Sequence, residues 1–522
     1  MGHPNRYAAL AVFAVVTLFG IALRPLLPID ETRYVGVAWD MHLTGDYLVP
    51  TKNFELYTHK PPLLFWVMNL LWGVFGVSEY VARLAAPMFS LATIWLTGRL
   101  ATQLWPDDAG IGGRAMWALA GTFSFAIYGG ATMFDTALAT ATLLGLLSLV
   151  AALKTGRWRY WTGFGVALAV GALAKGPVIF VHLLPAVLFA PVWAKHLGPV
   201  TPTRLGAGLG LALITGLAVA ALWLVPAIIS GGAQYRDAIL WKQSAGRIAQ
   251  SFAHARPFYW YAALTPLLLF PWVFVPQLWR AMAKASWADT GLRLAAIWGG
   301  ASLILFSFIS GKQLHYLVPE LPAIALIVAR LSPSFGDARP WIPAALIALA
   351  GALFCAAGVG VVDVTHLSEL LTPQITLLAV GFTLLALSGL AMSDNIVRGG
   401  AVLSLGLLLC LGLTIRFTDL FDAYDARIIA QTLAPYEEGG IAVFTDEYHA
   451  QFNFGARATR HMTPIATMDA LKDWAHAHPN GAIVGRRDKT PITDAPATTI
   501  VYDSHPYAIW PVDELTREMS QK

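Results

Sequence analysis

The chain has 522 residues, of which 57% are hydrophobic and only 13% are charged. The charged share is about half that of a typical soluble protein, so the composition excludes a soluble multidomain protein and indicates a polytopic membrane protein. The net charge of +4 is too small for a nucleic-acid binder. Both cysteines, Cys355 and Cys410, lie in apolar runs, which argues against a disulfide framework or a cysteine-ligated zinc site.

The first apolar segment, 7–26, follows a short basic start and ends at Arg24, Pro25 and Pro28 instead of a small-residue cleavage site. It is predicted to be a membrane helix whose N-terminus is cytoplasmic. Twelve more apolar segments approach the length of a membrane span, which gives thirteen predicted helices. They are 80–103, 115–130, 136–153, 159–173, 177–194, 205–229, 257–279, 292–309, 314–330, 341–361, 373–393 and 399–416.

Segment 61–76 is apolar but only marginally long, and the basic loops decide its placement. If the chain alternates sides after 80–103, one set of loops is rich in Lys and Arg, whereas the short loops on the other side, around Asp135 and Asp363, carry none. The positive-inside rule assigns the basic set to the cytoplasm. These residues are Arg99, Arg114, Lys154, Arg157, Arg159, Lys195, Arg204, Arg280, Lys284, Arg293, Arg330, Arg339 and Arg398. Segment 61–103 then crosses once, so 61–76, with Trp66 and Trp72, is predicted to lie along the outer interface.

The last hundred residues differ in composition, because 15 of the 31 acidic residues lie between Asp419 and Glu518. The predicted domains are a membrane domain, 1–416, and a small α/β domain, 417–522. A catalytic loop, 27–79, is predicted outside the cytoplasm within the first. Helices are expected at 421–434 and 468–478, and strands at 441–445, 482–485 and 498–502. The same alternation of basic and non-basic loops places this domain outside the cytoplasm. That compartment is the periplasm if the membrane is a bacterial inner membrane.

Two adjacent carboxylates, Asp30 and Glu31, open the first outer loop and are candidates for a general base or a cation ligand. The alternative is that Asp30 caps a solvated helix. The loop ends at Lys60, whose direction is fixed by Pro61 and Pro62. Lys60 is a candidate ligand of a lipid phosphate, and the alternative is an interfacial lysine that snorkels.

Further ionisable residues lie between apolar segments or in the outer loops. Asp135 and Lys175 are expected to be paired or functional if they lie in the bilayer, or else to be plain loop residues. The remaining candidates for phosphate or substrate binding are Arg247, His254, Lys312 and Tyr316, of which the last two can also simply anchor a helix end. The candidate ligands for a divalent metal are His59, His254 and Glu31, although their spacing across two loops is not diagnostic.

The order of these motifs resembles a known family. The runs D-E-T-R-Y, G-D-Y-L-V-P and Y-T-H-K-P-P-L-L-F-W resemble the first outer loop of the lipid A aminoarabinose transferases, in the GT-C superfamily that includes the protein O-mannosyltransferases. The resemblance continues through M-F-D-T, L-A-K-G-P, R-P-F-Y-W-Y with F-P-W, and G-K-Q-L-H-Y-L-V-P. It covers most of the first 330 residues.

The resemblance implies a GT-C fold with thirteen helices and a periplasmic C-terminal domain. It implies a transferase that moves a sugar from a polyprenyl-phosphate donor to lipid A or another envelope acceptor. Nothing in the sequence requires a cofactor, although a divalent metal can assist. The resemblance implies Asp30 as the catalytic carboxylate, with Glu31 beside it. It implies contacts with the donor phosphate for Arg33, Tyr57, Lys60 and Tyr316. It also implies that Asp135 matches an acidic position of the family and that His254 lies in a loop that contributes to the substrate cavity.

One position departs from the family pattern. The aminoarabinose enzymes usually have Y-E-K-P-P, whereas this chain has His59 before Lys60. Loss of a carboxylate beside the sugar predicts a neutral or acidic donor sugar in place of aminoarabinose. The lipid-phosphate interpretation does not depend on this residue.

Two other functions stay open from the sequence. A flippase or transporter for an anionic lipid would also need outward-facing cations, although it would not need the carboxylate pair, and no internal repeat supports an inverted-repeat transporter. A transferase of the same superfamily that glycosylates protein or another glycan would share the donor chemistry and differ only in its acceptor.

Overall fold

The computed structural model describes residues 7–198, 200–239, 255–362, 374–493 and 495–515. The chain divides into two compact units. We call Met1–Ile21, His59–Leu64 and Arg83–Thr414 the helical unit, and Ala22–Thr58, Phe65–Ala82 and Ile415–Lys522 the loop–sheet unit. The first outer loop therefore belongs with the C-terminal residues in one unit, whereas the predicted boundary at 416/417 divides them.

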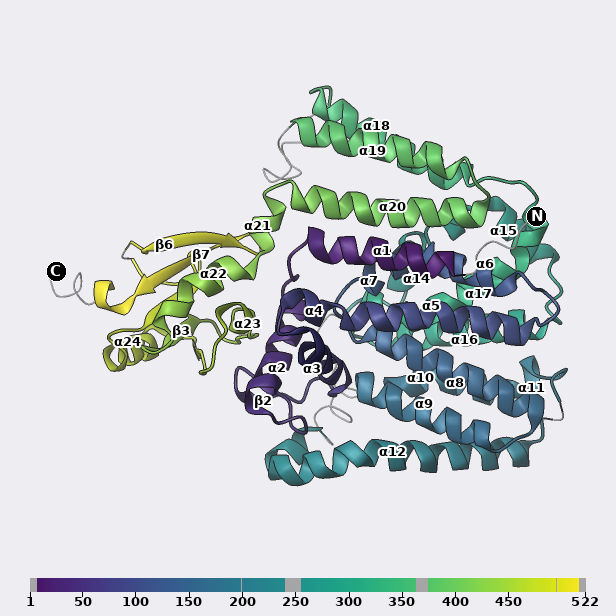
Figure 1. Cartoon of the computed structure of the whole chain (residues 1–522), viewed down its shortest axis with the longest axis horizontal. Coiled ribbons are helices and arrows are strands. Elements are labelled where there is room, and N and C mark those ends of the chain that lie inside the picture. Colours follow the sequence, from purple (N-terminus) through teal and green to yellow (C-terminus); the bar gives the residue numbers. More distant parts are fainter. Residues whose placement is uncertain (1–6, 199, 240–254, 363–373, 494, 516–522) are drawn as a thin grey trace. The chain divides into compact units, whose positions relative to one another are not determined.

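Long apolar helices build the helical unit, and the chain is a multi-pass membrane protein. Among the described residues, eight helical stretches are long and apolar enough to span a membrane: Glu79–Leu104, Asp135–Thr155, Arg159–Leu188, Pro202–Asp237, Thr290–Phe308, Leu314–Phe335, Trp341–Gly358 and Ile396–Arg416. Three apolar helices are shorter: Ala8–Leu23, Leu63–Phe75 and Ile375–Ala391. Figure 1 shows α5 (Ala85–Leu104), α8 (Asp135–Thr155), α9 (Arg159–Lys175) and α12 (Pro202–Asp237) packed in that order.

The other helices of this unit complete the bundle. They are α1 (Ala8–Leu23), α6 (Ile111–Ala120), α7 (Phe123–Gly129), η1 (Gly176–Val178), α10 (Ile179–Leu188), α11 (Ala190–Trp193), α14 (Trp260–Leu268), η3 (Trp272–Phe274), α15 (Pro276–Lys284), α16 (Thr290–Phe308), η4 (Leu314–Glu320), α17 (Leu321–Leu331), η5 (Ser332–Phe335), α18 (Trp341–Gly358), α19 (Gln374–Ala391) and α20 (Ile396–Arg416). The α18–α19 pair packs extensively along its length.

Several predicted membrane helices differ in the structure. Segment 177–194 divides into η1, α10 and α11, and its first part continues the stretch that begins at Arg159. Segment 115–130 divides into α6 and α7 at Gly121 and Thr122. A Cβ on Gly121 would lie 2.9 Å from the Ala401 nitrogen of α20, and the Thr122 hydroxyl accepts a 2.8 Å hydrogen bond from Trp272. Segment 257–279 divides into α14, η3 and α15, because Pro271 and Pro276 cannot supply the amide protons that a continuous helix needs.

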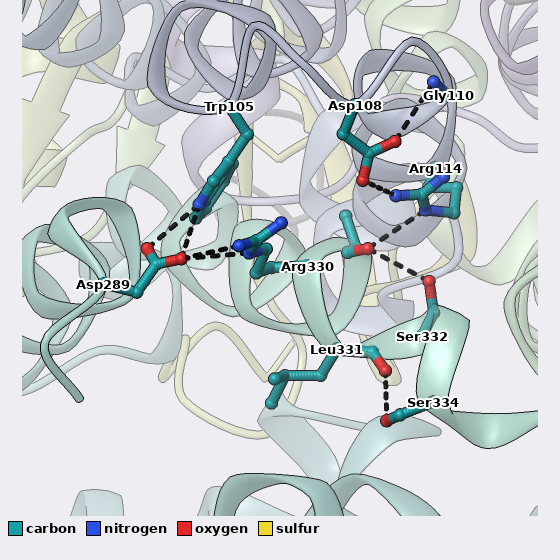
Figure 2. A network of polar contacts seen from close by, with 10 residues as sticks. Trp105, Asp108, Gly110, Arg114, Asp289, Arg330, Leu331, Ser332 and Ser334 are labelled. Atoms are coloured by element: carbon teal, nitrogen blue, oxygen red, sulfur yellow. Dashed lines mark hydrogen bonds and ion pairs between the residues drawn. The ribbon is translucent and has the colours of Figure 1, made fainter. Parts of the chain in front are cut away.

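A polar network joins the ends of four helices in the helical unit (Figure 2). Asp289 caps α16 through the amides of Gly291 and Leu292, and it accepts hydrogen bonds from Trp105 at 2.9 Å and Arg330 at 3.0 Å. Arg114 pairs with Asp108 and donates to the Ala329 carbonyl at 3.1 Å. The network fixes the ends of α5, α6, α16 and α17, and it contains two of the arginines assigned to basic loops.

The loop–sheet unit begins with α2 (Asp30–Thr44), the hairpin β1 (Thr51–Lys52) and β2 (Glu55–Leu56), most of α3 (Leu63–Phe75), and α4 (Glu79–Arg83). With 13 residues, α3 is about 20 Å long, which is short of the ~30 Å hydrocarbon core. Its outer side chains are apolar, and Leu70 is 68% exposed. The helix is confirmed, and its location at an interface stays a prediction.

The C-terminal residues of this unit form a five-stranded mixed sheet in the order β4-β3-β5-β7-β6. Its elements are α21 (Leu420–Tyr424), α22 (Ala426–Leu433), η7 (Ala434–Tyr436), β3 (Ile441–Phe444), α23 (Asn453–Ala456), β4 (Thr463–Ile465), α24 (Met468–Ala477), β5 (Ala482–Arg486), β6 (Thr498–Tyr502) and β7 (His505–Pro511). The predicted strands and the helix at 468–478 are confirmed, whereas segment 421–434 divides into α21 and α22 at Asp425, whose backbone is extended and whose side chain caps α22. Two strands were missed, β4 because it has three residues and β7 because its HPYAIWP sequence contains two prolines.

Candidate functional site

The predicted site residues are divided between the two units. The helical unit holds His59, Lys60, Asp135, Lys175, Lys312 and Tyr316, and the loop–sheet unit holds Asp30, Glu31, Arg33 and Tyr57. Arg247 and His254 lie outside the described residues. Each unit therefore contributes its own cluster of candidate groups.

Asp135 and Lys175 form a buried ion pair in the helical unit. Asp135 begins α8 and Lys175 ends α9. These two helices are antiparallel neighbours joined by a short turn, so the two side chains meet at one end of the pair. The Lys175 Nζ lies 2.6 Å from Asp135 Oδ1. Each charge also has the sign that its helix end favours. The prediction that both residues are paired is confirmed, and the interpretation as plain loop residues is wrong.

The short helix η4 adds His315 and Tyr316 to this pair. The His315 Nε2 lies 3.9 Å from Asp135 Oδ2, and the Lys175 Nζ lies 4.2 Å from the centre of the Tyr316 ring. Lys60 also acts electrostatically on Asp135, and its Nζ lies 5.7 Å from the centre of the neighbouring Phe134 ring. One carboxylate thus faces two lysines, and a histidine that is positive when protonated, and this excess of lysine charge suits an anionic ligand. We call these residues the cationic cluster.

Lys312 has a different environment. Its Nζ donates to the carbonyl oxygens of Ile309 at 2.6 Å and Arg256 at 2.9 Å, and its side chain is buried. These bonds close a loop that also contains the Ala255–Gly311 bridge. In this structure Lys312 ties two backbone segments together, which favours the anchoring alternative. Its contact with substrate stays a prediction.

Asp30 is the accessible carboxylate of the loop–sheet unit. It is the first residue of α2, where Ile29 is the N-cap, and no side-chain cap hydrogen bond is made. The capping interpretation of Asp30 is therefore wrong. Its carboxylate instead pairs with Arg33 and accepts a 3.1 Å hydrogen bond from Tyr34, while 42% of the side chain stays exposed. This geometry orients the carboxylate and leaves it open to a reactant.

Glu31 points in another direction and is buried. Its carboxylate is held by the guanidinium of Arg24, with one N–O distance of 2.8 Å, and by the Leu27 amide at 2.8 Å. These bonds occupy the carboxylate, so Glu31 connects the end of the first helix segment to α2. No group of three or more His, Cys, Asp or Glu that could hold a metal occurs in the described part of the chain.

Tyr57 lies beside the Asp30–Arg33 pair. Its ring is buried and packs against Phe65 with ring centres 6.3 Å apart. Tyr57, Tyr34 and Asp30 raise the pKa of Arg33, and their effect exceeds the opposing effect of burial. The guanidinium is therefore a permanent positive charge beside the exposed carboxylate.

Several groups near these clusters were not among the residues predicted from the sequence. His315 belongs to the motif G-K-Q-L-H-Y and directly precedes the predicted site residue Tyr316. This position in the sequence could have identified it. Lys52, Glu447 and His449 also approach the Asp30–Arg33 pair, and they are described below. Glu447 and His449 lie about 400 residues from Asp30 in the sequence, so local patterns could not identify them.

Comparison with solved structures gives the fold class. Two crystal structures of ArnT from Cupriavidus metallidurans match 96% of this chain and 97% of that chain at 19% identity. The TM-score is 0.73 for ArnT bound to undecaprenyl phosphate and 0.74 for the apo state. The chain therefore has the fold of ArnT, and the predicted fold class, a helical polytopic membrane protein with a small C-terminal α/β domain, is confirmed.

Sequence comparisons point to the same group of proteins. The family described as dolichyl-phosphate-mannose-protein mannosyltransferase matches residues 59–224. An undecaprenyl phosphate-α-4-amino-4-deoxy-L-arabinose arabinosyl transferase of Pseudomonas fluorescens is 27% identical over 64% of this chain and 58% of its own length. The corresponding protein of Pseudomonas aeruginosa is 30% identical over 57% and 54%. The chain thus spans a little over half the length of these curated relatives, and the resemblance found from the sequence motifs is confirmed.

Proposed function

We propose that the protein is a membrane glycosyltransferase that moves a sugar from undecaprenyl phosphate to lipid A. The cationic cluster carries this proposal, because Lys60, Lys175 and His315 gather around one carboxylate at the end of α8 and α9. A polyprenyl-phosphate donor needs such a site for its phosphate and needs no nucleotide pocket. The ArnT fold and the names of the relatives support the same donor class.

The chemistry assigns a role to each cluster. The bond between the anomeric carbon and the donor phosphate oxygen breaks, and the phosphate leaves with the electron pair. Lys60 and its cationic neighbours stabilise the negative charge on that oxygen. The acceptor oxygen forms the new bond to the anomeric carbon. Asp30 takes the acceptor proton or stabilises the oxocarbenium-like carbon, and direct displacement inverts the anomeric configuration.

For the donor sugar we propose aminoarabinose, because both relatives named above carry this sugar in their names. The substitution at His59 favours a neutral or acidic sugar instead. These two expectations make opposite predictions for a donor competition. The protein is offered undecaprenyl phosphate carrying aminoarabinose or its hydroxyl analogue, and preference for the amino sugar supports our assignment.

For the location we propose the bacterial inner membrane, with the C-terminal residues in the periplasm. The positive-inside rule supports this orientation, since the loops rich in Lys and Arg lie on one predicted side. No cofactor is part of the proposal. Chelation of divalent ions by EDTA is expected to leave the transfer rate unchanged, and a rate restored only by added Mg²⁺ or Mn²⁺ would contradict this.

The test of the function is mass spectrometry of lipid A, glycans and envelope proteins from cells with and without the protein. We expect lipid A to gain the mass of the sugar only when the protein is present. Lys60→Ala is expected to abolish the gain, and Lys154→Ala, an exposed lysine in a basic loop, serves as the matched control. A mass gain on protein or on another glycan, with lipid A unchanged, would contradict the proposed acceptor.

A further inference from the structure

Three side chains from two distant segments meet near Asp30 and Arg33 within the loop–sheet unit. Lys52 belongs to β1, and Glu447 and His449 lie in the loop after β3. The Glu447 Oε1 lies 3.7 Å from the Lys52 Nζ and 3.5 Å from the His449 Nδ1. His449 is also within electrostatic range of Arg33 and Asp30. The C-terminal residues thus bring a carboxylate and an imidazole to the exposed carboxylate of α2.

The loop that carries Glu447 and His449 is fixed on α2 by close packing. Gly36 approaches Ala450 so closely that a Cβ on Gly36 would lie 2.9 Å from the Ala450 carbonyl oxygen. Nearby, Trp39 donates to the Ala458 carbonyl and Asn53 donates to the Met462 carbonyl, each at 2.8 Å. These atoms are buried, so the loop has a defined position relative to the helix.

The charges in this group are arranged for a polar ligand. Glu447 is 62% exposed, while Lys52 is largely covered. Both contacts are made by one oxygen, Oε1, and the side chain is largely exposed, so the carboxylate keeps lone pairs for an incoming donor. Burial lowers the pKa of His449, and the neighbouring Arg33 and Lys52 lower it further, against the opposing effect of Glu447. This direction favours the neutral imidazole, whose two ring nitrogens can exchange hydrogen bonds with a hydroxyl group.

We propose that Glu447 and His449 form the subsite that recognises the transferred sugar, with Glu447 binding the ammonium group of an amino sugar and His449 binding a ring hydroxyl. The inference rests on the proposed function and adds the residues that select the sugar. An exposed carboxylate beside an imidazole can bind a cationic, hydroxylated ligand.

The test compares two donors, undecaprenyl phosphate linked to aminoarabinose and to its analogue with a hydroxyl in place of the amine. We expect Glu447→Gln to raise KM for the amino donor by roughly tenfold or more, the value of one hydrogen bond to a charged group, and to leave KM for the hydroxyl donor within about twofold. The neighbouring exposed residue supplies the control, since Asp446→Asn is expected to behave as wild type. His449→Ala is expected to weaken both donors equally.

The outcomes separate the subsite from the function. If the wild type is active and Glu447→Gln keeps the full preference for the amino donor, the subsite is overturned and the transferase stands. If the wild type transfers neither sugar, the proposed function fails and the subsite fails with it. Tryptophan fluorescence during thermal unfolding verifies that each variant is folded, which is expected because Glu447 is exposed.

Discussion

Asp30 and Glu31 are neighbours in the sequence with opposite environments. Glu31 is buried against Arg24 and the Leu27 amide, while Asp30 is exposed and oriented by Arg33 and Tyr34. Their roles therefore separate, since a buried carboxylate in an ion pair stabilises the fold and an exposed one can reach a substrate. The sequence offered both as catalytic candidates, and only the structure distinguishes them.

Asp30→Asn tests the catalytic role. The amide keeps the shape of the carboxylate and loses its charge and basicity, so turnover is expected to fall by at least roughly 100-fold, the lower end for a general base. Donor affinity is expected to change little. Both quantities are measured on purified protein in detergent. Wild-type turnover in this variant would remove Asp30 from the mechanism.

Lys60→Ala tests the phosphate contact. Removal of the ammonium group takes one positive charge from the cationic cluster, so transfer is expected to be abolished or severely reduced while expression stays normal. Lys60→Arg is also expected to impair transfer, because a planar guanidinium presents its donors differently. Radiolabelled transfer in membranes measures both variants. Near-normal turnover of Lys60→Ala would leave the residue as an interfacial anchor.

Asp40 makes the stability of the loop–sheet unit depend on pH. Burial raises the pKa of Asp40 to about 7, although hydrogen bonds from the Phe54 amide and the Thr51 hydroxyl oppose this shift. Between about pH 4 and 7 the folded protein thus holds a proton that the unfolded chain has released. The free energy of unfolding contributed by this group is full below that window and falls as pH rises through it.

Asp40→Asn removes this titration, because the amide is neutral at every pH. We expect the apparent unfolding temperature to rise by several degrees at pH 8 and by clearly less at pH 5. Scanning fluorimetry at both pH values measures the difference, with the exposed Asp473→Asn as control. Equal shifts at pH 5 and pH 8 would show that charge on Asp40 is not the cause.

At the scale of elements, α10 and η4 are joined by a buried polar pair. The His182 Nδ1 lies 2.5 Å from Glu320 Oε1, and both side chains are buried among apolar groups such as Phe306. Neither His182 Nε2 nor Glu320 Oε2 has a hydrogen-bond partner among the described residues. Since η4 also carries His315 and Tyr316, this pair supports the segment that completes the cationic cluster.

Glu320→Ala is expected to destabilise the protein by roughly 3 kcal/mol, because removal of one partner leaves a buried polar group unpaired. Glu320→Gln, which can still bond to His182, is expected to cost clearly less. Chemical denaturation in detergent compares both with the exposed control Glu438→Ala. If Glu320→Ala is as stable as this control, the pair does not stabilise η4.

An element can be predicted from the sequence when the residues that cause it are close together in the chain. Asp135 and Lys175 stood out because charged residues interrupt apolar runs, and this signal is local. The break at Gly121 and Thr122 is caused by packing against α20 and by the bond from Trp272, which lies 150 residues away. Such tertiary causes leave no local pattern, so the sequence predicted one helix where the structure has two.

At the scale of the whole molecule, the arrangement of charge predicts the topology. A reporter fused after Lys522 is expected to be active outside the cytoplasm, and one fused after Arg157 is expected to report the cytoplasm, because the loop at Arg157 is basic. Paired alkaline phosphatase and fluorescent-protein fusions make the measurement. Access to a tag at Gly76 from the cytoplasm would overturn the interfacial location of 61–76.

The most direct test of the account is turnover by the purified protein in detergent. The protein is mixed with undecaprenyl-phosphate-aminoarabinose and lipid A, and the products are analysed by mass spectrometry. Because detergent offers no second compartment, transport cannot produce a signal here. We expect lipid A carrying one added sugar with wild-type protein, and little or none with Asp30→Asn or Lys60→Ala. Unchanged lipid A with folded wild-type protein, or equal product from all three, would contradict this expectation.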